Sequence, residues 1–191
     1  MISNKRIALL GLAILVMTTS ASAWYGWANR DKGPRTQMAW VYKGTDAREL
    51  FEYADIVALG TVTAAYPGRV VYVNGGEDKL PYQLVEFSIE SAVKGVRDGE
   101  IVMIERAGGM DPDGQYHVID ADGGEYWAGA RYLLFLKWQE NRSGYTYLIN
   151  DAARYEIERG RLTAVDDEDP VSARFEDMRA NKALDLLRSW N

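Results

Sequence analysis

Between residues 56 and 165 the sequence repeats one pattern, in which a short run of β-favouring residues is followed by a turn that contains glycine. The run at 84–90 alternates most regularly, with Val85, Phe87 and Ile89 on one side and polar residues on the other. Such alternation is typical of an antiparallel strand with one buried face. The turn signals lie at 74–76, 94–95, 143–144 and 159–160. We therefore expect a mainly β fold, either a small barrel or a sandwich.

A helix is predicted at each end of this β-rich part. Asp46 and Glu49 form a capping-box pattern, and the apolar residues that follow share one helical face, which predicts a short helix over 46–54. Near the C-terminus, Asp169 can cap a helix that begins at Pro170. Apolar stripes then predict that this helix continues to Trp190, with a bend or break near 181.

The first predicted strand, over 56–65, is long and contains a glycine at position 60. A glycine inside a strand allows a sharp bend, because there is no side chain to obstruct a close approach of the backbone. A long first strand that bends in this way favours a small antiparallel OB-like β-barrel. The predicted organisation is a signal peptide (1–23), an aromatic polar arm (24–44), the OB-like barrel domain (45–166) and a C-terminal helix packed on the barrel (167–191).

The N-terminal residues predict export. Lys5 and Arg6 precede an apolar run over 7–17, and Ala21 and Ala23 supply the small residues of a signal-peptidase site, which predicts cleavage after Ala23. The alternative is an uncleaved membrane anchor formed by residues 7–27. Either way we expect an exported protein, periplasmic or secreted if the segment is removed, and in contact with a membrane only if it is retained.

Composition excludes several kinds of chemistry. The chain has no cysteine and one histidine, so disulfides, thiolate metal sites, cysteine nucleophiles and polyhistidine metal sites are ruled out. His117 stands alone, and no G-x-S-x-G nucleophile motif is present, which argues against a catalytic triad. The net charge of −6 argues against a nucleic-acid partner that is bound through bulk positive charge.

Four short motifs together resemble a known family. They lie at 53–62, 85–95, 108–109 and 129–136. The combination resembles a group of exported bacterial proteins that are similar to the netrin-like, tissue-inhibitor-of-metalloproteinase-like variant of the OB-fold. The resemblance implies a non-catalytic barrel used for binding in the cell envelope or outside it. Those inhibitors bind zinc through an N-terminal cysteine, which this chain lacks, so none of the family's functional residues is carried over.

Two groups of residues are candidate sites. Tyr66, Tyr72 and Tyr82 cluster around the first strands, where aromatic rings can stack on sugars or peptides, although rings that simply cover a barrel would look the same. The second group is rich in carboxylates, which are the oxygen ligands that calcium prefers, although Asp-Gly pairs are also ordinary turn formers. Its members are Asp111, Asp113, Asp120, Asp122 and Glu125. Apart from this calcium site no cofactor is expected.

These observations leave three functional hypotheses. The first is an exported, non-enzymatic β-barrel that binds a protein or glycan partner in the envelope or outside the cell. The second is an envelope hydrolase that uses carboxylates or a bound divalent cation. The third is a structural or assembly subunit that docks through its N-terminal arm or its C-terminal helix.

Overall fold

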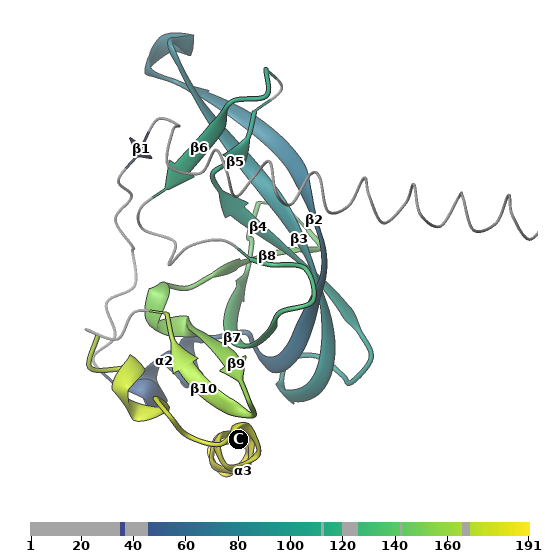
Figure 1. The fold of residues 1–191 in the computed structure, drawn as a ribbon, viewed down its shortest axis with the longest axis vertical. Helices are drawn as coiled ribbons and strands as arrows, with labels where there is room; N and C mark the ends of the chain where they lie inside the picture. The colour runs from purple at the N-terminus through teal and green to yellow at the C-terminus, as the bar shows by residue number, and fades with distance from the viewer. Residues whose placement is uncertain (1–34, 37–45, 112, 120–125, 142, 166–168) are drawn as a thin grey trace, which may run out of the picture.

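The computed structural model describes residues 35–36, 46–111, 113–119, 126–141, 143–165 and 169–191 (Figure 1). Within them the chain is mainly β, with one helix before the large sheet and one after it, which confirms the predicted class. The large sheet contains β2 (Ile56–Val73), β3 (Asp78–Lys94), β4 (Ile101–Ala107), β7 (Arg131–Trp138), β8 (Tyr145–Leu148), β9 (Arg154–Glu158) and β10 (Arg161–Ala164). The small sheet contains β1 (Arg35–Thr36), β5 (Gly109–Met110) and β6 (Tyr116–Ile119).

Five strands of the large sheet pair in a closed cycle, which we call the ring. β2 pairs with β3 and β3 with β4, both antiparallel. β4 then pairs with β8 in the parallel sense, over Met103 and Ile104. β8 pairs antiparallel with β7, and β7 returns antiparallel to β2. β7 also pairs with β9, over Tyr132 to Leu134. β10 follows β9 through a tight turn at Arg159 and Gly160, both with positive φ, where the sequence predicted a turn.

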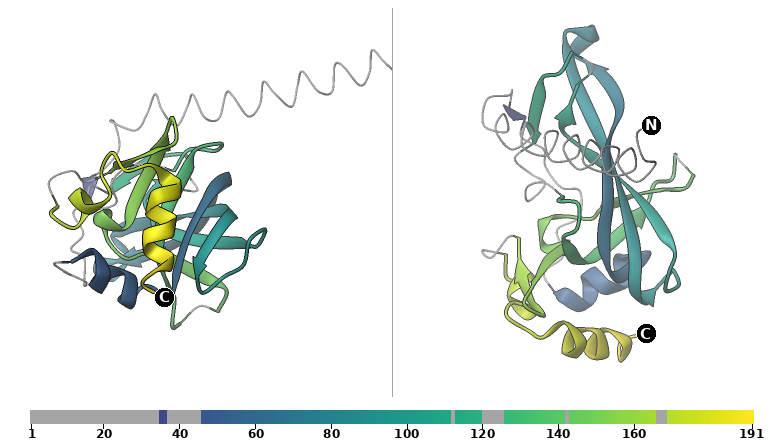
Figure 2. Two further views of the ribbon diagram at one scale, coloured as in Figure 1. Left: turned by 90° about the horizontal axis from the view of Figure 1, so that it is seen from below. Right: turned by 45° about the vertical axis from the view of Figure 1, so that its right-hand side comes forward.

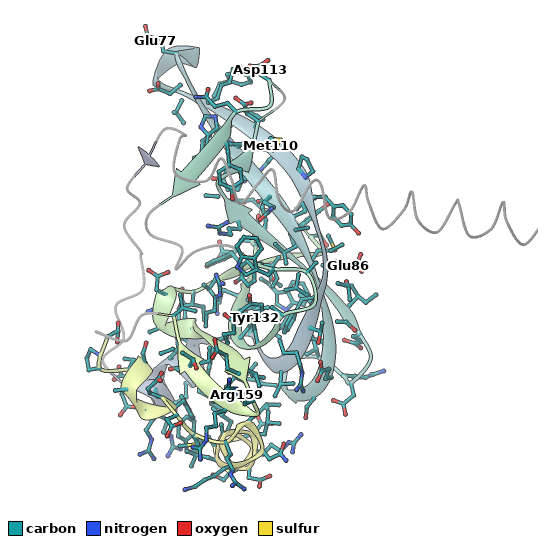
Figure 3. All side chains as sticks on the ribbon, in the orientation of Figure 1. Glu77, Glu86, Met110, Asp113, Tyr132 and Arg159 are labelled. Carbon is teal, nitrogen blue, oxygen red and sulfur yellow. The ribbon has the colours of Figure 1, made fainter. Side chains whose placement is uncertain are left out.

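β2 and β3 are much longer than the other strands of the ring. β7 covers β2 only as far as Thr61, while β4 still covers β3 as far as Tyr82. Past Pro67 and Tyr82, β2 and β3 continue as a two-stranded ribbon to the turn η1 (Asn74–Gly76). We call residues 63–83 the hairpin arm. Figures 1 and 2 show the arm projecting from one end of the ring, and Figure 3 places Glu77 at its tip.

Gly60 lies where β2 curves inside the ring. The pairing with β3 shifts register between Leu59 and Gly60, which agrees with the predicted bend. A Cβ at position 60 would overlap the carbonyl oxygen of Ser88 and would lie 2.9 Å from the Phe87 ring. No larger residue fits between these two strands without moving one of them.

The two helices lie at the end of the ring opposite the arm (Figure 2). α2 (Ala47–Tyr53) is capped by the Asp46 carboxylate, which accepts a hydrogen bond from the backbone N–H of Arg48, and Leu50 and Phe51 are buried. The C-terminal helix differs from the prediction, because α3 spans only Ala180–Arg188. The Asp169 carboxylate does cap the chain at Val171, but only a 3-10 turn, η3 (Ser172–Arg174), follows.

The early break has a tertiary cause. The backbone of Asp177 and Met178 forms hydrogen bonds with the backbone of Leu162 in β10. This segment therefore lies alongside β10 and does not continue the helix. Four aromatic side chains then pack the C-terminal segment against the large sheet. The centre of the Phe175 side-chain ring lies within 6.2 Å of those of Phe135, Tyr155 and Trp190. The core therefore lies between the ring and the two helical segments. No helix in the described ranges is long and apolar enough to span a bilayer.

Candidate functional site

A cavity of about 600 Å³ opens beside β4, at the point where β8 leaves it. The pairing of β4 with β8 ends at Ile104 and Thr146, and the next residues of β4 form one wall of the cavity. We call it the β4–β8 cavity. Its lining consists of Arg69 from β2, Tyr82 from β3, residues 104–107 of β4, Tyr126, residues 138–141 after β7, and Tyr147 and Leu148 of β8.

A charged pair forms one side of this cavity. The Arg69 guanidinium donates two hydrogen bonds to the Glu105 carboxylate, Nε to Oε1 at 3.0 Å and Nη2 to Oε2 at 3.1 Å. Gln139 Nε2 donates to the same Oε2 at 2.9 Å. The Glu105 side chain is 1% exposed and that of Arg69 is 44% exposed, so the pair is open to solvent from the arginine side. Glu105 raises the pKa of Arg69, and the guanidinium stays charged.

Aromatic rings form the remaining surface. Arg69 lies over the ring of Tyr82, with its guanidinium carbon 4.5 Å from the ring centre. Trp138 keeps 41% of its surface exposed at the end of β7. On the inner side, Tyr126 packs edge-on against Tyr132 at 5.5 Å, and the guanidinium of the buried Arg154 lies 4.2 Å from the Tyr126 ring. Flat aromatic faces and planar polar groups therefore share one cavity.

Asp55 fixes the segment that carries Trp138. Its Oδ2 accepts from the backbone N–H of Trp138 and its Oδ1 from Lys137 Nζ, both at 2.9 Å. Burial raises the pKa of Asp55, but the hydrogen bonds from Lys137 and Trp138 and the charge of Lys137 outweigh it, and the pKa lies below the usual value. The ionised carboxylate thus anchors the strand end from which the cavity residues 138–141 continue.

The structure separates the three tyrosines that the sequence suggested. Tyr82 lines the β4–β8 cavity. Tyr66 is 44% exposed on the outer face of the arm, where its hydroxyl donates to Glu86 at 3.2 Å. Tyr72 is 61% exposed near the tip of the arm. Of the three, Tyr82 alone is among the residues that line the cavity.

Two residues of the proposed calcium group have other partners. Asp111 is buried and accepts from the backbone N–H groups of Asp113 and Gln115 and lies 3.1 Å from the ring of His117. Burial raises the pKa of Asp111, but the hydrogen bonds with Gln115 and His117 lower it by more, so the net shift of the pKa is downward. Asp113 pairs with Lys79 of β3.

The rest of the calcium prediction concerns Asp120, Asp122 and Glu125, which lie outside the described residues, as do the predicted signal peptide and nearly all of the predicted aromatic arm. Among the residues that are described, no three His, Asp or Glu side chains come together in a way that could hold a metal ion. Calcium binding therefore stays a prediction.

Sequence reasoning missed Arg69, Glu105, Gln139 and Trp138 as members of one site. They come from three different parts of the chain and meet only when the ring closes. One signal was present. Glu105 and Arg106 continue the apolar run of β4, and adjacent charged residues in such a strand are unusual unless the structure supplies partners for them.

Comparisons of this chain with protein-family models, with curated proteins and with solved structures found no match.

Proposed function

We propose that this chain is an exported, non-enzymatic binding protein that holds part of a glycan in the β4–β8 cavity. One observation carries the proposal, namely that an exposed tryptophan, a tyrosine and a set of planar hydrogen-bonding side chains line one cavity of about 600 Å³. Sugars present apolar C–H faces that stack on aromatic rings, and hydroxyl groups that need both donors and acceptors.

The polar side chains of the cavity match this requirement. Gln139 and Asn141 each offer an amide donor and an amide acceptor, Glu140 offers a carboxylate, and Arg69 offers donors on its exposed side. A cavity of this volume accommodates a small ligand or one end of a longer chain, whereas a protein–protein interface is usually broader and flatter. A glycan is therefore favoured over a folded protein partner.

The same geometry favours binding over hydrolysis. Glu105 is the carboxylate at the centre of the charged pair, and both of its oxygens accept hydrogen bonds from Arg69 or Gln139. A general acid must give up a proton to the leaving group, and a carboxylate held by a guanidinium is poorly suited to that role. We assign Glu105 to shaping the cavity.

Two further parts of the proposal concern the fold and the compartment. We propose that the ring is a small OB-like barrel, because five strands close with one parallel pair and the first strand is long and bent. Oligosaccharides are among the ligands that barrels of this type bind on their strand face and loops. Export rests on the basic and apolar residues over 5–23 and is part of the proposal for that reason.

Titration calorimetry with cello- and chito-oligosaccharides tests the proposal. We expect saturable binding of at least one series, and a loss of at least about tenfold in affinity for Trp138→Ala. Tyr72→Ala is the matched control, because it removes an exposed ring outside the cavity. Absence of binding to both series, or equal affinity of Trp138→Ala and the unaltered chain, would contradict the proposal.

A further inference from the structure

The hairpin arm has one strand edge that no other described strand covers. β7 pairs with β2 as far as Thr61, and the backbone of Val62 bonds to Gly129 and Ala130. From 63 to 73, β3 is the one described strand that pairs with β2. A strand edge of this length is a template for another strand, because its N–H and C=O groups are arranged at the spacing that a β-ladder needs.

The pairing with β3 shows which groups point to this open edge. Val70 lies opposite Pro81, which has no N–H and whose carbonyl accepts from Gly108 on the side away from β2. This pair is therefore one of the non-hydrogen-bonded pairs of the antiparallel ladder. Because such pairs alternate, Val70 and Tyr72 direct their N–H and C=O groups away from β3, while Val71 and Val73 bond to it.

We propose that a second copy of this chain pairs with this edge in the antiparallel sense over residues 70–72, with Val71 opposite Val71 on a two-fold axis. In that register Val70 of each copy lies opposite Tyr72 of the other. All four outward-pointing N–H groups then meet carbonyl groups of the partner copy. The edge is self-complementary, because the same two residues supply donors and acceptors on both sides.

The sequence around the segment limits the pairing to one partner. Pro67 has no N–H to donate, and a register irregularity separates it from Val70, so the ladder cannot extend toward the ring. The turn η1 ends it on the other side. The opposite edge of the arm is covered, since Pro81 bonds to Gly108 and Lys79 pairs with Asp113. A closed dimer follows, and not an open-ended sheet.

Charge selects the antiparallel arrangement. Glu77 lies at the tip of the arm (Figure 3), and the half-exposed Arg69 lies at the other end of the open segment. Antiparallel pairing brings the tip of each copy toward Arg69 of the other copy. Parallel pairing would place the two Glu77 carboxylates near each other, where like charges repel.

Sedimentation equilibrium of the full chain tests whether it associates. We expect a concentration-dependent dimer, weakened at least about tenfold by Tyr72→Pro, which removes an outward N–H but no hydrogen bond to β3. Tyr72→Thr keeps that N–H, and we expect it to retain the dimer. A chain that stays monomeric at all concentrations would overturn the proposal and point to a strand of another protein. A dimer that survives Tyr72→Pro would also overturn it.

Disulfide trapping tests the register independently of any loss of folding. The natural chain has no cysteine, so each variant carries a single thiol. The two-fold axis puts the Cα atoms of the two Val71 residues about 4.5 Å apart, within the range that a disulfide requires. Val71→Cys should therefore form a covalent dimer on mild oxidation. Val73→Cys should not, because its two copies would lie roughly 13 Å apart. Equal yields, or no covalent dimer of Val71→Cys, would contradict the register.

Discussion

The ring and the hairpin arm are built from the same two strands but in different surroundings. In the ring, β2 is buried over its first five residues because β7 and β3 flank it and the helical segments cover one end. In the arm it keeps β3 as its strand partner and is largely exposed from Ala65 to Pro67. The difference shows that the strand's surroundings, more than its β propensity, decide where its residues become buried.

This contrast assigns different roles to the two regions. Burial of apolar side chains supplies most of the free energy of folding, and the buried apolar cluster comes from the ring and the segments packed on it, with no member in the arm. A two-stranded ribbon is only marginally stable by itself, so the arm depends on the ring for its position. We expect substitutions in the ring to change stability and substitutions in the arm to change association.

The largest expected effect is in the core between the ring and the C-terminal segment. Phe175→Ala removes a fully buried ring that contacts Phe135, Tyr155 and Trp190, and we expect it to lower the free energy of unfolding by about 4 kcal/mol. Urea unfolding followed by circular dichroism measures it. Tyr72→Ala is the counterpart in the arm, and we expect a change below about 0.5 kcal/mol. Similar losses for the two variants would remove the distinction between the regions.

A second comparison uses two glycines. We expect Gly60→Ala to cost about 2 kcal/mol, because the new methyl group would overlap the Ser88 carbonyl inside the ring. Gly75→Ala in η1 meets no atom within 4 Å, but its φ of +73° is unfavourable for alanine, and the expected cost is about 1 kcal/mol. The same unfolding measurement compares them. If Gly75→Ala proves the more harmful, close packing at the bend of β2 is not the limiting feature.

The third prediction concerns pH. The pKa of Asp55 is lowered in the folded state, so its bonds to Lys137 and Trp138 add stability at neutral pH that is lost as pH falls from about 4 through the lower folded value. We expect Asp55→Asn to lower stability by about 1 kcal/mol at pH 7, after allowance for its partial exposure, and by less below pH 4.

Melting temperatures of the unaltered chain and Asp55→Asn between pH 2.5 and 7 test this. Asp113→Asn is the matched change in the exposed ion pair with Lys79, and we expect no measurable shift for it at any pH. A difference between Asp55→Asn and the unaltered chain that stays constant down to pH 2.5 would show that the charge of Asp55 does not matter.

The smallest expected effect is an alternation of amide exchange rates along residues 70–73 of the arm. Below the concentration at which the chain associates, the amides of Val71 and Val73 should exchange with solvent more slowly than those of Val70 and Tyr72, by roughly tenfold. Amide hydrogen exchange by NMR measures it. Raising the concentration should slow exchange at Val70 and Tyr72 specifically. Uniform exchange along 70–73 would mean that the ladder of the arm is not formed as described.

Local patterns were enough to predict the class of fold. The alternation of Val85, Phe87 and Ile89 gave a buried strand face, and Asp46 capped the expected helix. The helix expected from Pro170 was wrong in extent, because β10 draws Asp177 and Met178 into backbone bonds that no local pattern reveals. A tertiary hydrogen bond outweighed local helix propensity there.

The candidate site was predicted less well for a related reason. Tyr82 was singled out because of its residue type, but Arg69 and Glu105 are 36 residues apart and meet through strand pairing. Trp138 reaches the same cavity from β7. Single-sequence patterns describe neighbours along the chain, whereas this cavity depends on how the strands close.

The way the ring closes has a consequence for its motions. β8 holds the cycle together through Met103 and Ile104 on one side and through the end of β7 on the other, whereas β2 and β3 pair over nearly their whole length. Thermal opening should begin at the shortest ladder, so this seam is expected to separate first. Because the β4–β8 cavity lies along the seam, a bound molecule that contacts both β4 and β8 would hold these two strands together. Binding of such a molecule would then slow the local opening of the whole ring.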